Sequence, residues 1–151
     1  MYLLVRAAVA AEVRDLQRAV LRPGGPLPGD LPPPPDSLHV AALMDGVVVG
    51  AATVMPAPWP GPDVLQEPAW RLRGMVVAEG ARGTGIGRAV LDRAVALAVS
   101  EGAASVWAEA RTSALGFYRG AGWTVVGDEW EKLGVGPHRY IQRQVSDPEN
   151  A

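Results

Sequence analysis

The sequence contains no cysteine, and its only two histidines, His39 and His138, lie far apart along the chain. Without cysteine there is no disulfide, no thiolate nucleophile and no cysteine-ligated metal. No stretch has the ligand spacing of a zinc site. We therefore expect no bound metal, and any nucleophilic chemistry must use another group.

Long uncharged apolar runs are also missing. The N-terminal stretch "MYLLVRAAVAAEVRDL" is interrupted by Arg6, Glu12 and Arg14, which leaves no apolar core for a signal peptide. No run approaches the roughly 20 apolar residues that span a bilayer. The formal net charge of -2 gives no electrostatic footprint for nucleic acid or an anionic membrane. We expect a cytoplasmic protein that binds neither.

The composition that remains is that of an ordinary globular protein. With 151 residues, 48% hydrophobic and 20% charged, the chain is predicted to form one domain over residues 1–151. A Pro/Gly-rich stretch at 22–37 follows a predicted helix at 10–21. Only about twenty residues precede that stretch, too few for an independent core, so we interpret it as a loop and not as a linker.

The remaining pattern alternates strands and helices. Asp45-Gly46 between apolar segments 38–44 and 47–55 predicts a two-residue β-hairpin. Periodicity predicts further strands at 2–6, 69–78, 104–110, 123–130 and 138–145, and further helices at 85–100 and 113–122. This order describes an α+β domain with a mixed sheet.

A glycine-rich loop, "EGARGTGIGRAV" at 79–90, joins a predicted strand to a predicted helix. Unpaired amides and the positive end of the helix dipole make such a loop an anion site. The Walker pattern needs Lys and then Ser or Thr after its last glycine, whereas Arg88-Ala89 follow Gly87. A nucleotide triphosphatase is thereby excluded.

The dinucleotide-binding fingerprint fails as well. It needs a small residue at its sixth position, which is Arg88 when counted from Gly83 and Val90 when counted from Gly85. The preceding strand also belongs to a predicted meander and does not open a βαβ unit. These two departures exclude a nucleotide-dependent oxidoreductase.

A third pattern, Arg/Gln-x-x-Gly-x-Gly/Ala, is filled by residues 82–87. It is found in the GNAT superfamily of acetyl-CoA-dependent N-acetyltransferases. "LRGMVVAEGARGTGIGRAVLDRAV" resembles that family's central strand, pyrophosphate loop and helix, and "SALGFYRGAGW" resembles the helix and strand that follow, with Trp123 replacing the usual Phe. The resemblance covers nearly the whole chain. It implies a mixed central sheet of about seven strands flanked by helices, with splayed central strands forming the acetyl-CoA cleft.

The resemblance also assigns the donor site. The backbone of Met75, Val76 and Val77 would bind the pantetheine arm, and an amide there would face the acetyl oxygen as negative charge develops on it. The pyrophosphate would be held by loop amides with two arginines nearby, a set made up of Arg82, Gly83, Thr84, Gly85, Ile86, Gly87 and Arg88.

Tyr118 is the main catalytic candidate, because a family member's Tyr at this helix position protonates the departing coenzyme A thiolate. A phenol with a pKa near 10 suits that task. Neighbouring helix residues point about 100° apart, so Phe117 is predicted to face the core while Tyr118 faces the co-substrate. The alternative role for Tyr118 is packing in the core or against the co-substrate.

Two side chains are candidates for the base that takes the ammonium proton. Glu109 shares a strand face with Trp107; its alternative role is an ion pair with Arg111. His138, in "GVGPHRY", resembles the Gly-Pro-His ending of some family members that acetylate small molecules, and an acceptor-site role follows from that resemblance.

Other polar and aromatic residues have plainer interpretations. Asp128 and Glu129 are predicted to lie on a solvated strand edge, and His39 is predicted to be structural. Trp59, in a second Pro-rich loop, either lines an acceptor site or is exposed without a role.

These inferences predict direct transfer of an acetyl group from acetyl-CoA to a primary amine of a small molecule, since no cysteine is available for an acyl-enzyme. The alternative is a non-catalytic acyl-CoA-binding or sensor module. The family often has a second helix where residues 22–37 stand, so the acceptor stays open. Many members pair through their C-terminal strands, so the resemblance also admits a homodimer.

Overall fold

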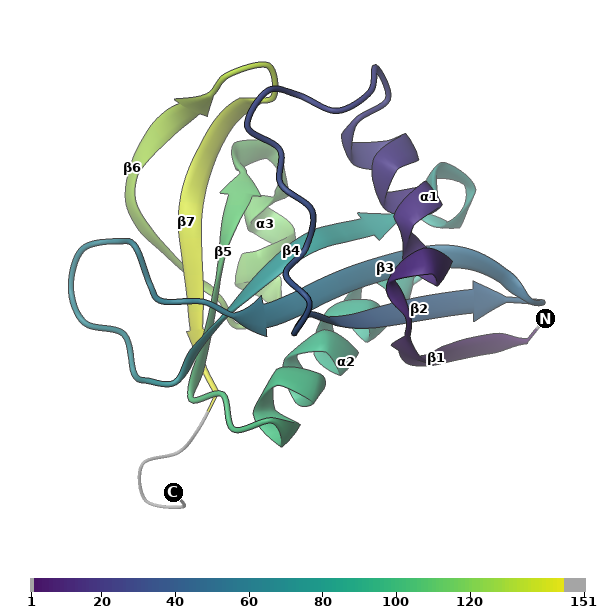
Figure 1. Ribbon diagram of the computed structural model, residues 1–151, viewed down its shortest axis with the longest axis horizontal. Helices are drawn as coiled ribbons and strands as arrows, with labels where there is room; N and C mark the ends of the chain where they lie inside the picture. The colour runs from purple at the N-terminus through teal and green to yellow at the C-terminus, as the bar shows by residue number, and fades with distance from the viewer. Residues whose placement is uncertain (1, 146–151) are drawn as a thin grey trace. The chain divides into compact units, whose positions relative to one another are not determined.

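The computed structural model describes residues 2–145. Its seven strands form one mixed sheet in the order β1-β2-β3-β4-β5-β7-β6 (Figure 1). The strands are β1 (Leu3–Ala8), β2 (Leu38–Met44), β3 (Val47–Pro56), β4 (Ala69–Val77), β5 (Ser105–Arg111), β6 (Thr124–Lys132) and β7 (Gly136–Gln144). The helices are α1 (Ala10–Leu21), α2 (Ile86–Ser100) and α3 (Leu115–Gly120), with 3-10 turns η1 (Glu79–Ala81) and η2 (Thr112–Ala114). The predicted α+β class and strand number are confirmed.

The chain divides into two compact units. Unit 1 contains residues 2–55 and 72–98, and unit 2 contains residues 56–71 and 99–145. Neither unit is a continuous stretch of sequence, and β4 supplies its first residues to unit 2 and the rest to unit 1. The ends of the predicted 1–151 domain, residues 1 and 146–151, lie outside the described residues.

In unit 1 the predicted helix at 10–21 and the predicted Asp45-Gly46 hairpin are both present. Glu12 Oε1 accepts a hydrogen bond from the amide of Val9 at 3.0 Å, which caps the start of α1. The turn between β2 and β3 places Asp45 at φ 50° and Gly46 at φ 84°, the left-handed pair that a type I′ hairpin requires.

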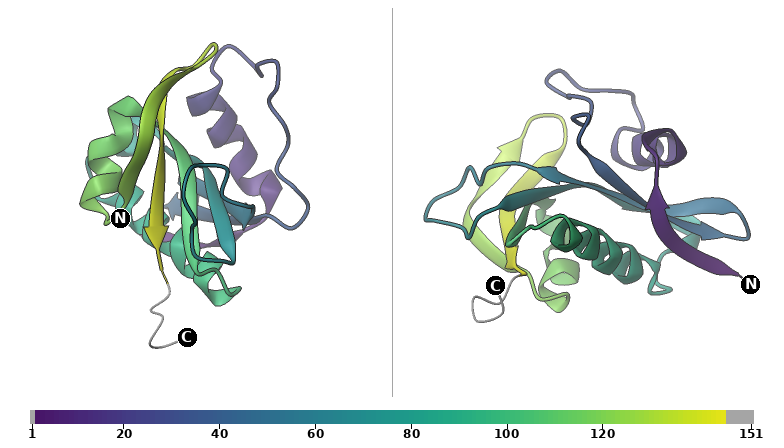
Figure 2. Two further views of the ribbon diagram at one scale, coloured as in Figure 1. Left: turned by 90° about the vertical axis from the view of Figure 1, so that its left-hand side faces the viewer. Right: turned by 60° about the horizontal axis from the view of Figure 1, so that its bottom comes forward.

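The β2–β3 hairpin carries a helix on each face (Figure 2, right). Val13 of α1 belongs to a buried cluster with Ala41 and Ala51, which pair across the two strands. The next pair along, Ala42 and Gly50, points the other way, and a Cβ on Gly50 would press on Val90 of α2. Small residues in the hairpin therefore let α1 and α2 approach it closely.

Strand β4, predicted at 69–78 and found at Ala69–Val77, has an irregular backbone at Gly74. Gly74 has φ 65°, a left-handed conformation, and a Cβ there would overlap the Nε2 atom of Gln17. Gln17 Nε2 donates to the carbonyl oxygen of Gly74 and to Thr53 Oγ1, each at 3.0 Å. A glycine inside a strand is the signal for such an irregularity.

In unit 2, β7 pairs antiparallel with both β5 and β6, and the first residues of β4 pair parallel with β5. The register sets Arg71 beside Trp107, Glu109 opposite Tyr140 and Arg111 opposite His138. Because side chains alternate along a strand, Trp107, Glu109 and Arg111 share one face of β5.

The Pro/Gly-rich segment 22–37 forms no helix or strand. An ion pair between Arg22 and Asp30, with Nε–Oδ2 at 2.8 Å, closes its first half, and Arg73 Nη2 donates to the Leu31 carbonyl oxygen at 2.9 Å. No helix within residues 2–145 is long and apolar enough to cross a membrane.

Candidate active site

The glycine loop of unit 1 turns sharply between β4 and α2. Gly83 and Gly85 adopt φ 76° and 83°, and a Cβ on either would meet no atom within 4 Å. Only glycine adopts this conformation without strain, and the space beside both residues is open. The loop is therefore shaped so that another molecule can approach its backbone.

The start of α2 presents its backbone donors to this loop. The Ala89 amide donates to the Gly85 carbonyl oxygen at 3.1 Å, so the amides of Ile86 and Gly87 precede the helical ladder. The first turn of α2 contains no acidic residue. Thr84 Oγ1 donates to the Ala81 carbonyl oxygen and steadies the turn. These features favour an anion at the helix start.

The two arginines of the motif differ in their surroundings. Arg82 Nε donates to the Val77 carbonyl oxygen at 3.1 Å, which ties the loop to the end of β4 and leaves the terminal guanidinium nitrogens directed elsewhere. Arg88 is paired with Asp92 through Nε–Oδ1 at 3.0 Å, one turn along an exposed part of α2. Within residues 2–145 Arg82 has no carboxylate partner, so an anion at the loop would meet its charge uncompensated, whereas Asp92 compensates the charge of Arg88.

The end of β4 supplies the residues predicted to bind the pantetheine arm. Val76 is buried in the unit 1 core, whereas Met75 and Val77 are half-buried. The buried side chain of Val76 thus packs β4 against the core, while Met75 and Val77 lie nearer the surface.

The prediction that Phe117 faces the core is wrong. The side chain predicted to face the core, Phe117, is 40% exposed, whereas Tyr118 is 8% exposed. The Tyr118 ring packs edge-on against Phe117 and Trp123, with centroids 5.1 and 5.6 Å away. Because α3 is a single short helix, its one inward face takes Tyr118, and Phe117 points toward solvent.

Burial has a direct chemical effect on the Tyr118 phenol. It disfavours the phenolate and raises the pKa of Tyr118 to about 12. The side chain is therefore a neutral hydrogen-bond donor throughout the physiological pH range. That is the form a general acid must have.

Glu109 lies in an ionic cluster on the predicted face of β5. Its Oε2 atom accepts from Arg71 Nη2 at 3.1 Å and Lys132 Nζ at 3.2 Å, partners that the sequence analysis did not assign. Both bonds end on the same oxygen, and the side chain is 20% exposed. Oε1 is therefore the atom that remains to receive a proton or a substrate N–H.

His138 is buried on β7, and its ring stacks on Trp130 with centroids 5.2 Å apart. Burial lowers the pKa of His138; Lys132 and Arg111 lower it further, and Gly136 and Glu109 partly oppose them. The Nδ1 atom lies 2.8 Å from the Gly136 carbonyl oxygen and so carries the proton when the ring is neutral. The free Nε2 is a proton acceptor at neutral pH.

Trp59 is half-buried and packs edge-on against Trp107 and Tyr140, with centroids 5.8 and 5.3 Å away. Its Nε1 donates to the Pro62 carbonyl oxygen at 2.9 Å, and a Cβ on Gly61 would overlap its ring. The loop at 56–62 therefore folds around this indole. No single sequence signal linked Trp59 to β5 and β7, because the contact depends on the register of three distant segments.

The residues given plainer roles behave as predicted. His39 is buried, and its Nδ1 lies 2.9 Å from Thr53 Oγ1. Asp128 and Glu129 are exposed on β6, which is an edge strand of the sheet.

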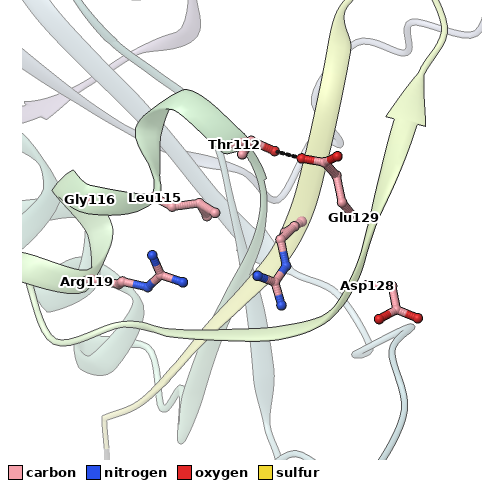
Figure 3. A pocket seen from close by; sticks show the side chains of 7 residues that line it. Thr112, Leu115, Gly116, Arg119, Asp128 and Glu129 are labelled. Atoms are coloured by element: carbon pink, nitrogen blue, oxygen red, sulfur yellow. Dashed lines mark hydrogen bonds between the residues drawn. The ribbon is translucent and has the colours of Figure 1, made fainter.

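Glu129 also belongs to a hollow on the other face of β7. Figure 3 shows Thr112 directed at Glu129, with Oγ1–Oε1 at 2.8 Å. The hollow is lined by Thr112, Leu115, Gly116, Arg119, Asp128, Glu129 and Arg139. None of the predicted catalytic side chains is among them.

The predicted site residues thus fall into two groups. The donor-binding group, Met75 to Val77 and Arg82 to Arg88, lies in unit 1. The catalytic candidates Tyr118, Glu109 and His138 lie in unit 2, where register brings Glu109 and His138 to one face of β5 and β7.

Known proteins share this sequence pattern and fold. The Acetyltransferase (GNAT) family model matches residues 11–123. An uncharacterized N-acetyltransferase of Bacillus subtilis (strain 168), YitI, is 30% identical over 102 residues, which cover 68% of this chain and 67% of that protein.

Solved structures agree at the level of the fold. An acyl-CoA N-acyltransferase from Pseudomonas aeruginosa has a TM-score of 0.74 at 20% identity, covering 94% of this chain and 99% of that one. An aminoglycoside 6'-N-acetyltransferase complexed with coenzyme A has a TM-score of 0.72 at 14% identity, covering 96% and 99%. The chain is therefore an N-acetyltransferase that belongs to the acetyltransferase (GNAT) family, whose members use acyl-CoA.

Proposed function

We propose that this protein transfers the acetyl group of acetyl-CoA directly to a primary amine of a small molecule. The observation that carries the proposal is the open glycine loop, with Gly83 and Gly85 in left-handed conformations at the start of a helix that lacks first-turn acids. A solved structural neighbour was crystallised with coenzyme A, which supports the same type of donor.

Bound acetyl-CoA supplies an activated thioester. The ammonium first gives one proton to a base, and the amine nitrogen then gains the acetyl carbon and loses a second proton as the carbon–sulfur bond breaks. The departing sulfur gains one proton, so coenzyme A leaves as the thiol. The residues of unit 1 bind and orient. Amides from Gly83 to Gly87 and the Arg82 guanidinium would hold the pyrophosphate. Backbone groups of Met75, Val76 and Val77 would bind the pantetheine and donate to the acetyl oxygen.

The residues of unit 2 move protons. Tyr118, kept as a phenol by burial, would donate toward the sulfur as the carbon–sulfur bond breaks. Two groups would accept the ammonium proton: Oε1 of Glu109 or Nε2 of neutral His138. The hydrogen bonds of both side chains leave these atoms for that role. We favour His138, because Glu109 is already engaged in ion pairs with Arg71 and Lys132.

The donor assignment is tested by thermal unfolding in the presence of acetyl-CoA. Binding to the folded state at 100 times the dissociation constant should add about 2.7 kcal/mol to the free energy of unfolding. An unchanged unfolding temperature at millimolar acetyl-CoA would contradict the loop assignment.

The catalytic assignment is tested by thiol release from acetyl-CoA across amines, amino acids, polyamines, aminoglycosides and peptides. Release with at least one small amine is expected. Binding of acetyl-CoA with no release across the whole panel would instead indicate an acyl-CoA-binding module.

A further inference from the structure

Three of the five tryptophans lie together in unit 2. Trp59 and Trp107 both contact Tyr140, with centroids 5.3 and 6.2 Å away, and Trp130 contacts it at 5.7 Å. We call Trp59, Trp107, Trp130 and Tyr140 the aromatic cluster. Trp59, Trp130 and Tyr140 are half-buried, so the cluster presents ring surface at the side of β5 and β7 that carries both candidate bases.

Positively charged side chains outnumber carboxylates beside the aromatic cluster. Glu109 is the carboxylate at its centre, and Arg71 and Lys132 both bond to it. Arg111 shares the same face of β5 and adds a third cation that acts on His138. Arg71 and Lys132 together carry two positive charges against the single carboxylate of Glu109, which leaves an excess of positive charge beside the aromatic cluster.

Two buried donors at the cluster also lack a partner among residues 2–145. They are Arg71 Nε and Trp130 Nε1. Arg71 stacks over the Trp107 ring at 5.1 Å, so one ring face that could receive a substrate cation is already occupied by an arginine. Unpaired buried N–H groups are costly, and the contacts within residues 2–145 account for neither of these two donors.

We propose that the acceptor is a primary amine on an aromatic body that also bears a carboxylate, bound at the aromatic cluster; this inference rests on the proposed transferase function. The rings contact the aromatic body. The excess of Arg71 and Lys132 over Glu109 attracts the carboxylate and repels polycations such as polyamines and aminoglycosides. The amine then faces Glu109 and His138.

The first test compares kcat/KM for matched acceptors with saturating acetyl-CoA. L-Phenylalanine should exceed phenethylamine, which lacks only the carboxylate, and spermidine, each by roughly tenfold or more. L-Tryptophan against tryptamine should show the same preference. A preference for spermidine or an aminoglycoside would overturn the inference and leave the transferase proposal standing.

Variants separate the rings from the charges. Trp59→Ala should raise the KM for L-phenylalanine about tenfold and leave the KM for acetyl-CoA unchanged. Gly61→Ala keeps every ring but displaces Trp59, because the added Cβ would overlap the indole, and it should also raise the KM for L-phenylalanine.

Tyr2→Ala is the control: it removes an aromatic ring in unit 1 that is 68% exposed, and it should change neither KM. Lys132→Gln should reduce the preference for L-phenylalanine over phenethylamine.

A binding measurement makes the result independent of turnover. L-Phenylalanine should change the tryptophan fluorescence of the protein, and the change should be smaller in Trp59→Ala. If acetyl-CoA binds but L-phenylalanine neither reacts nor alters the fluorescence, the acceptor inference is wrong. If L-phenylalanine binds and acetyl-CoA does not, the acceptor site stands and the transferase proposal fails.

Discussion

Removal of the Tyr118 hydroxyl is the most direct test of the general-acid role. Tyr118→Phe removes one oxygen from a buried ring, so acetyl-CoA affinity should be retained. Turnover should fall by roughly 10²- to 10⁴-fold, because no positioned donor would then protonate the departing sulfur. The measurement is kcat for thiol release, together with the dissociation constant of acetyl-CoA.

Trp123 provides a matched control beside Tyr118. The two rings are in contact, and Trp123 Nε1 is buried with no partner among residues 2–145. Trp123→Phe therefore loses no hydrogen bond and should keep kcat within a small factor. Equal rates for Tyr118→Phe and the natural protein would remove Tyr118 from proton transfer.

The two buried histidines make stability depend on pH. Burial lowers the pKa of both His39 and His138 from the ordinary value of 6.5. Below that value the unfolded chain binds protons that the folded protein resists, so the free energy of unfolding should fall as pH drops through and below 6.5. Chemical denaturation at pH 7.5 and at about pH 5 measures the difference.

Replacement of one histidine measures how much that residue contributes to the pH dependence of the free energy of unfolding. His138→Gln should flatten the dependence between about pH 5 and pH 7.5 without abolishing it, because His39 remains. Glu12, whose pKa Arg6 lowers from 4.5 to about 2, acts at lower pH and does not interfere. If the free energy of unfolding of His138→Gln depends on pH as strongly as that of the natural protein, His138 does not contribute to this dependence.

Among the elements, the glycine loop allows a paired test. Gly85→Ala forces a side chain into a left-handed conformation at a cost of about 1–2 kcal/mol, so the loop should relax and lose its amide alignment. Acetyl-CoA affinity should fall by about tenfold. Calorimetric titration of both proteins with acetyl-CoA gives the comparison.

Gly80 is the control from the same connection between β4 and α2. Its φ is not left-handed, and a Cβ there would meet no atom within 4 Å. Gly80→Ala should bind acetyl-CoA like the natural protein. If both alanine variants bind normally, the backbone of this loop does not hold the pyrophosphate.

At the scale of helices and strands, sequence patterns predicted the features that local interactions control. Helix α1 begins and ends at the predicted residues 10 and 21, and the Asp45-Gly46 hairpin is as predicted. The irregularity at Gly74 was not predicted, because it depends on Gln17, which is distant in sequence. The short α3 was predicted as a helix, but its inward residue was not: which face of one helical turn is buried depends on the strands beneath it.

For the whole molecule, we expect a single unfolding transition. Each unit is assembled from two separate stretches of sequence, and β4 contributes to both, so neither unit is a chain segment that folds alone. Calorimetric and van't Hoff enthalpies should agree, with and without acetyl-CoA. Two resolved transitions, only one of them shifted by acetyl-CoA, would contradict the prediction of one domain.

The sequence by itself determined the family, the mixed α+β fold and the residues of the loop, because these depend on local signals: glycines at fixed spacing, a hairpin dipeptide and apolar periodicity. Only the tertiary structure decided that Phe117 is exposed, that Glu109 pairs with Arg71 and Lys132, and that Trp59, Trp107, Trp130 and Tyr140 meet. The two ion pairs of Glu109 join side chains 23 and 38 positions apart, and the aromatic contacts join residues of a loop and of three strands. Strand register fixes them, and register is a property of the folded sheet, which no local stretch of sequence encodes.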